Sequence, residues 1–390
     1  MLDSVPPPLP SSPLVSPSST YKINTITEGQ VHETRSSSPS ECESESEKDS
    51  AKRSTSKINP VLGALGVYCT GINFEGFDTP DAKTFNHIFS FKERTFADKS
   101  QPPDGKRSLL LHNMKYMMRV YPNGSRITSN NFDPILYWKR GVQMAALNWQ
   151  TFDKGMQQNQ AMFAGGTDYS GYVLKPREGR EIQMIQHSAQ VVGKRARKNV
   201  AFKIDVISAQ QLMRPYTLGE KRSLDPYVEV EVFLADDKRN KPDAPVTPSQ
   251  DALLKKRTTI VRENGFNPEF DGSFAFNVTT KYPDLIFVRW SVKLADKTYN
   301  DRAPPLATYT VKLCNLKQGY RTIPLLDPNG DRFLFSTLFC KIEKSPTADV
   351  MINCPKEAPK SGKLKTISTI GKNLLPSSIS PKSSMENGRS

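Results

Sequence analysis

Histidine is scarce in this sequence, and the histidines present do not follow the spacing of any recognisable catalytic motif. General acid and base chemistry near neutral pH most often uses histidine. The chain has 4 of them, namely His32, His87, His112 and His187. We expect His87 and His112 to lie in helical segments as structural residues. A serine nucleophile elbow, a phosphate-binding P-loop and an HExxH zinc motif are absent. The residues alone therefore assign no catalytic group.

The 5 cysteines form no pattern typical of a metal site or a disulfide framework. They include no C-x-x-C pair and no close His–Cys cluster, which argues against structural zinc and against a secreted disulfide scaffold. The longest apolar run, near Val61–Cys69, is far shorter than the roughly 18 residues of a membrane-spanning helix. The proline-rich start also lacks the pattern of a signal peptide. We expect a cytoplasmic protein that associates with membranes peripherally.

Positive charge is in excess, with 54 Lys and Arg against 40 Asp and Glu and a net charge of +14. This balance favours an anionic partner such as nucleic acid, an acidic protein or a phospholipid surface. The sequence shows no recognition helix, zinc finger or RNP-type aromatic strand, so we expect no nucleic-acid partner. Its 30 prolines beside 36% hydrophobic residues indicate that composition changes along the chain.

Two terminal segments have the composition of disordered chain. Residues 1–57 are rich in Ser, Pro and charge, and residues 346–390 form a basic tail without periodicity. The acidic stretch Glu41–Asp49 has two readings, an autoinhibitory lid over a basic site or ordinary solvated charge, and the second is the more common for such runs.

Residues 58–178 alternate short apolar runs with helical patterns, from LGALGVYC to GYVLKP. This alternation predicts parallel strands joined by helices. The number of strand candidates, about four, is half of what a closed (β/α) barrel needs. We therefore expect a half barrel with two open edges and an uncovered interior, which requires a partner half. Trp138, Trp149 and, further on, Trp290 lie in periodic apolar runs and are predicted to be core or barrel-wall residues.

The periodicity changes to two after a basic bridge. We predict a linker over residues 179–198 that includes KRARK at Lys194–Lys198; phospholipid binding by this bridge is the less favoured alternative. Residues 199–345 then carry alternating runs from AFKIDVIS to FLFSTLFCKIE, separated by turn residues. This pattern predicts an antiparallel β-sandwich. The expected fold class is thus α/β followed by all-β.

A pair of residues on the run MMRVYP carries a chemical signal. Arg119 and Tyr121 are two apart, so in a strand they share one face near its C-terminal end, where barrel enzymes place their sites. A guanidinium offers a planar donor fork for phosphate, and a phenol stacks on a sugar ring or bonds its hydroxyls.

The run from Asn131 to Pro176, with FDPILYWKRGVQMAALNWQ and GYVLKP, resembles the Y half of the catalytic barrel of eukaryotic phosphoinositide-specific phospholipase C. The likeness extends upstream through MMRVYPNGSRITSNN and FSFKE. Downstream, DPYVEVEVF, NGFNPEF and LKQGYRTIPLLDPNGD resemble that family's C2 domain.

The resemblance implies a function and a division of labour. Ser90, Arg119 and Tyr121 match positions that contact the inositol ring and its phosphates in the family. The bond-breaking histidines and the main calcium site belong to the family's X half, for which residues 1–57 supply only a segment like the X/Y linker. We therefore expect a fragment, a truncated gene model or a product that needs its X half in cis or in trans, with no catalytic residue of its own.

The expected activity of the complete enzyme is calcium-dependent hydrolysis of phosphatidylinositol 4,5-bisphosphate to diacylglycerol and inositol 1,4,5-trisphosphate. The alternative is a catalytically inactive lipid-binding adaptor. The expected partners are a phosphoinositide membrane surface and the X half, and the chain is expected to be monomeric.

The C2-like region departs from the calcium-binding pattern of the family. Hard calcium prefers several clustered oxygen ligands. Asp225 and Asp296 match calcium-ligand positions, but Glu263 stands where the family often has asparagine, and Leu294 where an aspartate is expected. We predict weak or absent calcium binding here. Ser125 likewise occupies a place where some relatives carry a membrane-entering tryptophan.

Overall fold

The computed structural model describes residues 69–102, 104–164, 171–176, 179–180, 194–216, 218–219, 223–236 and 252–353. All described residues belong to one compact unit, which lies within Asn59–Ser390. The segments 1–57 and 354–390, for which disorder was predicted, lie outside the described residues. Among the residues described, no helix has the length and apolar character needed to cross a membrane.

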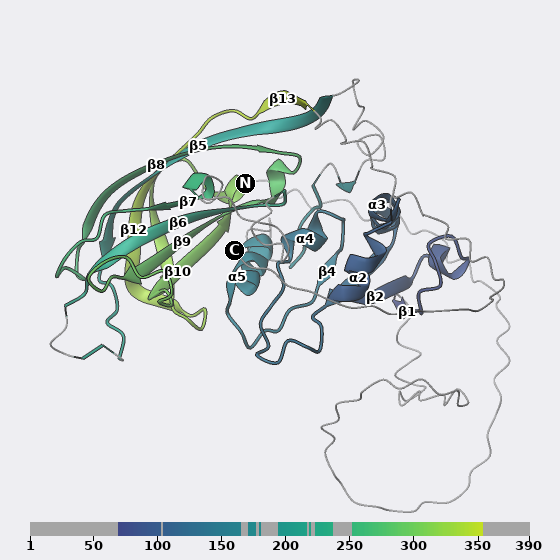
Figure 1. Ribbon diagram of the computed structural model, residues 1–390, viewed down its shortest axis with the longest axis horizontal. Helices are drawn as coiled ribbons and strands as arrows, with labels where there is room; N and C mark the ends of the chain where they lie inside the picture. Colours follow the sequence, from purple (N-terminus) through teal and green to yellow (C-terminus); the bar gives the residue numbers. More distant parts are fainter. Residues whose placement is uncertain are drawn as a thin grey trace, which may run out of the picture. The chain divides into compact units, whose positions relative to one another are not determined.

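A four-stranded parallel sheet forms the first part of the described chain. Its strands, in spatial order, are β1 (Thr70–Gly71), β2 (His87–Lys92), β3 (Met117–Tyr121) and β4 (Met144–Ala145). Between and after them lie η1 (Asp81–Lys83), α2 (Glu93–Lys99), α3 (Gly105–Lys115), α4 (Ile135–Trp138) and α5 (Lys154–Ala164). Figure 1 shows these elements in blue. The predicted half barrel is confirmed, with β1 and β4 as its two edges.

The two faces of this sheet have different surroundings. Side chains alternate along a strand, and Phe89, Phe91, Met118 and Val120 point to the face covered by helices, where they form one core with Leu109 of α3. The opposite face corresponds to the barrel interior. No described element covers it, so its side chains are exposed or half-buried.

A nine-stranded antiparallel assembly forms the second part. Its strands are β5 (Lys194–Gln210), β6 (Pro226–Leu234), β7 (Lys255–Arg257), β8 (Glu269–Thr280), β9 (Ile286–Leu294), β10 (Ala307–Lys312), β11 (Gly319–Leu326), β12 (Arg332–Lys344) and β13 (Ala348–Asn353), with short turns η3 (Pro283–Leu285) and η4 (Leu313–Asn315). Strands β8-β5-β12-β11 form one layer and β10-β9-β6-β7 the other. A core around Trp290 fills the space between the layers. The predicted sandwich is confirmed.

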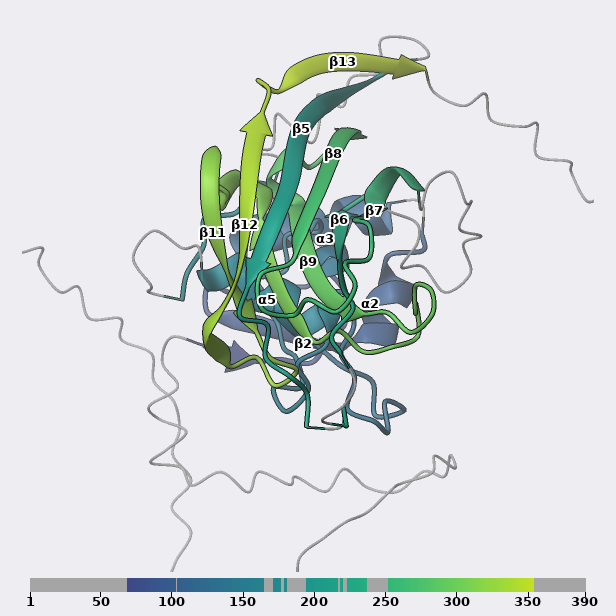
Figure 2. The same cartoon turned by 90° about the vertical axis from the view of Figure 1, so that its left-hand side faces the viewer.

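Two segments at the predicted boundaries of the linker and of the tail lie in strands. Lys194–Lys198, expected in the linker, belong to β5, and Ala348–Asn353, expected in the disordered tail, form β13. The two segments pair with each other from Asn199↔Ala348 to Lys194↔Asn353. Figure 2 shows β13 running along this end of β5. Backbone hydrogen bonds between segments distant in sequence create these strands, so neither needs an apolar period of its own.

The half barrel and the sandwich share a third core. Ile135, Trp138 and Met162 pack there with Phe233 and Phe287 of the sandwich. Trp138 and Trp290 are buried as predicted. The prediction for Trp149 is wrong, because its side chain is 72% exposed.

Candidate functional site

The side chains of Ser90, Arg119 and Tyr121 lie together on the open face of the half barrel. Ser90 on β2 pairs with Arg119 on β3, and the Arg119 Nη1 donates a hydrogen bond of 2.9 Å to the Ser90 Oγ. The Arg119 guanidinium also lies 4.8 Å from the centre of the Tyr121 ring, a cation–π geometry. Because the hydrogen bond to the neutral Ser90 hydroxyl uses only one N–H of the Arg119 guanidinium, other N–H donors stay available for an anion. No residue role is tested by this geometry, so headgroup contact stays a prediction.

Lys92 is a fourth residue of this cluster that the sequence reasoning missed. It is exposed, ends β2, pairs with Tyr121 across the strands, and follows Ser90 by two residues. The period of two therefore places it on the same face. Together, Ser90, Lys92, Arg119 and Tyr121, here called the open-face cluster, bring two cations, a hydroxyl and a phenol to one end of the sheet.

An ion pair fixes the loop that follows the open-face cluster. Both carboxylate oxygens of Glu93 accept from the Arg126 guanidinium, at 2.6 and 2.7 Å, and one also accepts from the Asn123 backbone N–H. Burial raises the pKa of Glu93, but the bonds from Arg126 and Asn123 outweigh it and lower the pKa overall. Ser125 in this loop accepts from the Asn123 Nδ2. The nearby side chain of Ile127 is 94% exposed, an apolar group at the rim that the sequence reasoning did not single out.

His87 and His112 form a buried structural pair. His87 lies in β2 and not in a helix as predicted, and its ring packs against the His112 ring of α3, with the ring centroids 5.1 Å apart. The two Nε2 atoms are 2.8 Å apart. The His87 Nδ1 is 2.6 Å from the Thr84 carbonyl oxygen and the His112 Nδ1 is 3.0 Å from the Asn113 Oδ1. Every ring nitrogen therefore has a partner within the protein, which argues against a catalytic role.

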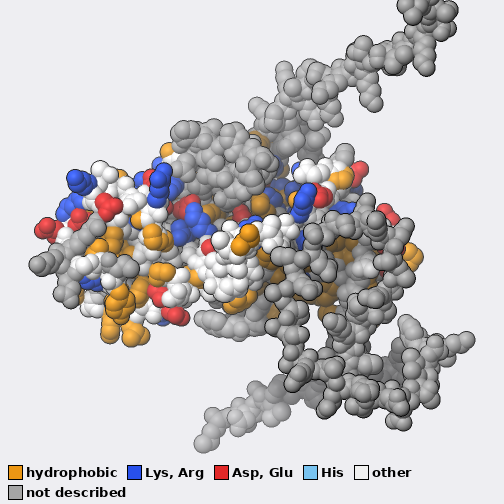
Figure 3. Space-filling model, turned by 60° about the horizontal axis from the view of Figure 1, so that its bottom comes forward, with side chains coloured by type: hydrophobic (Ala, Val, Ile, Leu, Met, Phe, Trp, Pro, Cys, Tyr) orange, Lys and Arg blue, Asp and Glu red, His pale blue; other side chains and the backbone are white. Residues whose placement is uncertain are grey.

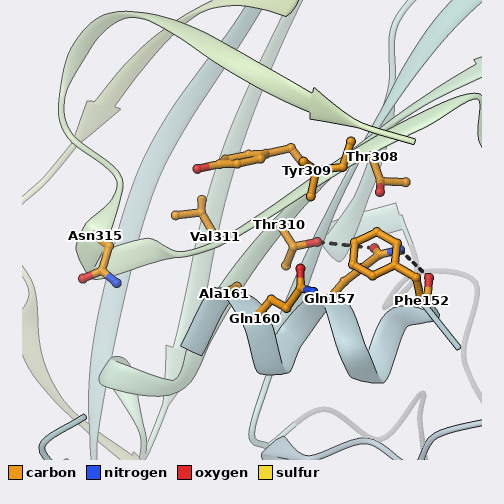
Figure 4. A pocket seen from close by; sticks show the side chains of 10 residues that line it. Phe152, Gln157, Gln160, Ala161, Thr308, Tyr309, Thr310, Val311 and Asn315 are labelled. Carbon is orange, nitrogen blue, oxygen red and sulfur yellow. Dashed lines mark hydrogen bonds between the residues drawn. The ribbon is translucent and has the colours of Figure 1, made fainter. Parts of the chain in front are cut away.

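Two pockets lie away from the open-face cluster. One, of about 860 Å³, is lined by His112 and Tyr116 among others. Tyr116 precedes β3, so this pocket lies at the strand end opposite to Tyr121. The second, of about 270 Å³, lies between α5 and β10. Figure 4 shows Gln157 crossing it from α5 towards Thr310 and Phe152. This pocket belongs to the junction of the two domains, and its lining residues carry no charge.

The predicted calcium residues lie close together but with an arginine between them. The Arg262 Nη1 donates to the Asp225 Oδ2 at 2.8 Å and to the Asp296 carbonyl oxygen at 2.9 Å. Leu294 pairs with Pro226 in the β6–β9 ladder and offers no ligand. Across the described ranges, no three His, Cys, Asp or Glu side chains group in a way that would hold a metal ion. The residues present therefore do not fit a C2 calcium centre.

Large apolar side chains are exposed near the same end of the sandwich. The most exposed are Met213, Tyr216, Phe266, Leu334 and Phe335, at 53%, 107%, 69%, 86% and 69%. Gln211 connects their segments, since its N–H donates to the Phe266 carbonyl and its own carbonyl accepts from the Ser336 hydroxyl. In Figure 3 hydrophobic side chains, in orange, gather at the left of the view, on the sandwich. Clustered, exposed apolar side chains are typical of a surface that contacts a membrane or another protein.

Comparison with known proteins identifies both folded parts. The profile of the phosphatidylinositol-specific phospholipase C Y domain matches residues 62–178, and that of the C2 domain matches residues 201–325. A 1-phosphatidylinositol 4,5-bisphosphate phosphodiesterase 1 of Candida albicans is 39% identical over 304 residues, covering 75% of this chain and 28% of that protein. The Saccharomyces cerevisiae protein of the same name is 35% identical, covering 74% and 33%.

The structural comparison agrees. The crystal structure of L. pealei PLC21 superposes with a TM-score of 0.57 at 27% identity, covering 74% of this chain and 34% of that one. The chain thus spans about a third of the length of the relatives it matches. A phospholipase C Y domain followed by a C2 domain, together with these relatives, assigns the chain to a family: it belongs to the phosphoinositide-specific phospholipases C.

Proposed function

We propose that the chain supplies the headgroup-recognising part of an enzyme that hydrolyses phosphatidylinositol 4,5-bisphosphate to diacylglycerol and inositol 1,4,5-trisphosphate. The observation that carries this proposal is the open-face cluster. Arg119 is held by the Ser90 hydroxyl and the Tyr121 ring, on the face that a second half would convert into a barrel interior. The names of the matched relatives support the same substrate.

In this proposal each residue of the cluster has a binding role. The Arg119 fork donates two parallel hydrogen bonds to a ring phosphate, and Lys92 adds a point charge for a second phosphate. The Ser90 hydroxyl contacts the headgroup while it orients the Arg119 fork, and the Tyr121 ring stacks against the inositol. The cluster contains no general base, so it orients the lipid headgroup and does not break the phosphodiester bond.

The chemical step then falls to a complementary X half. That half supplies the acid–base groups and, in the main, the residues that hold calcium, whose charge stabilises negative charge on the reacting phosphate. The edges β1 and β4 are the surfaces against which its strands pair, in cis or in trans. Otherwise the chain is monomeric. We place the Y domain at residues 58–178 and the C2 domain at residues 199–345, and the β5–β13 pairing extends the C2 domain at both ends.

A phospholipase Y domain and a C2 domain together indicate that the partner is a phospholipid membrane. We propose a cytoplasmic protein that associates peripherally with the phosphoinositide-bearing surface. The exposed apolar side chains at the sandwich end and Ile127 beside the open-face cluster support such contact, because both groups add apolar area to the surface.

Reconstitution tests the proposal. Labelled phosphatidylinositol 4,5-bisphosphate in mixed vesicles with calcium is incubated with the 390-residue chain alone, with a separately expressed X half of a family member, and with both. We expect hydrolysis only in the mixture, together with binding of inositol 1,4,5-trisphosphate to the chain alone. Headgroup binding without hydrolysis in a mixture that forms a stable complex contradicts the enzymatic role and leaves that of a lipid-binding adaptor.

A further inference from the structure

Arg262 occupies the centre of three loops at the end of the sandwich. These loops, here called the sandwich tip, are residues 223–225 before β6, 262–268 before β8 and 295–303 after β9. The Arg262 guanidinium donates to the Asp225 carboxylate at 2.8 Å and to the carbonyl oxygens of Asp296 and Lys297 at 2.9 and 2.7 Å. One side chain therefore connects all three loops.

The second carboxylate oxygen of Asp225 is also engaged. It accepts from the Glu263 backbone N–H at 2.8 Å and lies 3.5 Å from the Ser223 hydroxyl oxygen. The bond from Glu263, more than that from Arg262, holds the pKa of Asp225 below its ordinary value. Glu263 reaches this position with a φ of 56°, a left-handed conformation that costs free energy for a residue other than glycine or asparagine. The loop accepts that strain in order to direct its N–H at Asp225.

The oxygens around Arg262 are of the kind that calcium uses. Calcium takes 6–8 carboxylate, carbonyl and water oxygens at 2.3–2.6 Å, whereas here one carboxylate and two carbonyls already point at guanidinium hydrogens. A dication approaching the same oxygens must displace the guanidinium or lie beside its positive charge. Asp296 is the second residue that matches a calcium-ligand position, and its carboxylate accepts from the Asn300 side chain at 2.9 Å.

We propose that Arg262 is a resident cation that replaces calcium in this C2 domain. It crosslinks the loops through a carboxylate and two carbonyls, as a metal ion would, and keeps the sandwich tip assembled at any calcium concentration. Any calcium dependence of an enzyme built on this chain then arises outside the C2 domain. The proposal rests on the sandwich alone and is independent of the proposed headgroup site.

Calcium binding and thermal unfolding of the full chain test this proposal. The variants are Arg262→Gln, which removes the charge and leaves a shorter polar side chain, Arg262→Lys, which keeps the charge and loses the fork, and Arg302→Gln. Arg302 is exposed on the same loop as Asp296, so its replacement is a control for the loss of one positive charge. Calcium is titrated by calorimetry, and terbium by the luminescence that nearby tyrosines excite.

For the wild-type chain we expect no saturable binding up to about 1 mM calcium, far above the range of sensor sites, and the same melting temperature with calcium or with chelator. Arg262→Gln should melt several degrees lower in chelator, Arg262→Lys should recover part of that loss, and Arg302→Gln should melt like the wild type. Because Arg262→Gln frees the Asp225 carboxylate and two carbonyls, its melting temperature should rise with calcium.

Micromolar calcium binding by the wild-type chain overturns the proposal, as does an equal loss in Arg262→Gln and Arg302→Gln. Hydrogen exchange of the Glu263 amide in the wild-type chain keeps the test decisive where a variant does not fold. Protection in chelator equal to that in calcium supports Arg262 as the resident cation, and protection that requires calcium refutes it.

Discussion

The two sheets of this chain both carry charged side chains on one face, but the charges meet different surroundings. On the open face of the half barrel, Lys92 and Arg119 are exposed and have no carboxylate within ion-pair distance among the described residues. On the outer face of β6 and β9, Glu229, Glu231 and Arg289 are almost completely buried. The same residue types therefore serve as a ligand surface in one sheet and as internal structure in the other.

Contacts with α5 and with the neighbouring strands explain the buried face. Glu231 pairs with Lys154 of α5 at 3.2 Å and with Arg289 at 3.6 Å, and the Arg289 Nε donates to the Gln157 Oε1 of α5 at 2.7 Å. Glu229 pairs with Lys255, Arg257 and Lys293 at 3.1 to 3.7 Å. Buried charge is tolerated where it is paired. Unpaired, exposed cations at the end of a parallel sheet indicate instead a place where an anion binds.

The largest effect is expected on the covered face. Arg289→Ala should lower the free energy of unfolding by about 3–5 kcal/mol, because it removes a partner of buried Glu231 and leaves a cavity beneath α5. The unfolding midpoint in urea, followed by circular dichroism, measures the loss. Arg119→Ala is the matched control on the open face and should change stability by less than about 0.5 kcal/mol.

Replacing Glu231 and Arg289 together distinguishes the cost of an unpaired buried charge from the cost of lost packing. Glu231→Leu with Arg289→Met should recover most of the stability lost in Arg289→Ala, since apolar side chains of similar volume often replace a buried ion pair at little cost. A double variant as unstable as the single one would contradict the view that the unpaired charge is the main penalty.

The second prediction concerns ligand binding, for which replacing Arg119 should have a larger effect than replacing Arg289. Arg119→Ala should weaken binding of inositol 1,4,5-trisphosphate by about 1.5–3 kcal/mol, the range for a lost hydrogen bond to a charged group. Arg119→Lys should lose part of that affinity, because it keeps the charge without the fork. Calorimetry with the full chain measures both. Arg107→Ala, an exposed position on α3, removes the same charge away from the open face and should have no effect.

Local periodicity was sufficient to predict most of this fold. Runs of period two lie in β6, β8, β9 and β12, and β/α alternation gave the half barrel. The β5–β13 pairing was not predictable in this way, because Lys194–Lys198 and Ala348–Asn353 become strands through each other. The burial of Glu229 and Glu231 was also not predictable from the sequence. An alternation of Val and Glu describes a strand with one solvated face. Only the contacts of Glu231 with α5 and of Glu229 with the cations of β7 and β9 show that this face is covered.

The site residues also differ in whether local periodicity could predict them. Arg119 and Tyr121 share a face by strand period alone, and resemblance added Ser90. Lys92 obeys the same period relative to Ser90, but its place beside Tyr121 depends on the register between β2 and β3, which a single sequence does not specify. Arg262 was missed for a related reason. Its contacts with Asp225 and Asp296 join segments that are far apart in the chain, and no spacing rule anticipates a guanidinium in that place.

The third prediction concerns pH and the covered face of the half barrel. Burial lowers the pKa of His112 below its ordinary value of 6.5, partly offset by the bond to Asn113 and reinforced by His87 and Lys175. Just below pH 6.5 the unfolded chain therefore binds more protons at this site than the folded chain. By linkage, the stabilising contribution of His112 is complete above pH 6.5 and is lost as the pH falls towards the folded-state pKa.

Urea unfolding between pH 8 and pH 5.5 measures this contribution. His112→Gln, which keeps a polar group near Asn113 and does not titrate, should give a flatter profile than the wild type. An unchanged slope in His112→Gln would assign the pH dependence to other groups.

The smallest expected effect tests whether Lys92 belongs to the open-face cluster. Its ammonium is exposed and flexible, so a contact with phosphate should be worth on the order of 1 kcal/mol or less. Lys92→Gln should weaken binding of inositol 1,4,5-trisphosphate by that amount at low salt and by less as ionic strength screens the charge, with the free energy of unfolding unchanged. Lys106→Gln, exposed on α3, controls for the change in net charge. If Lys92→Gln and Lys106→Gln lose the same affinity relative to the wild type, the attraction comes from the overall charge of the chain, and the ligand surface consists of Arg119 with Ser90 and Tyr121. If only Lys92→Gln binds more weakly, the open face holds at least two cations that contact phosphate.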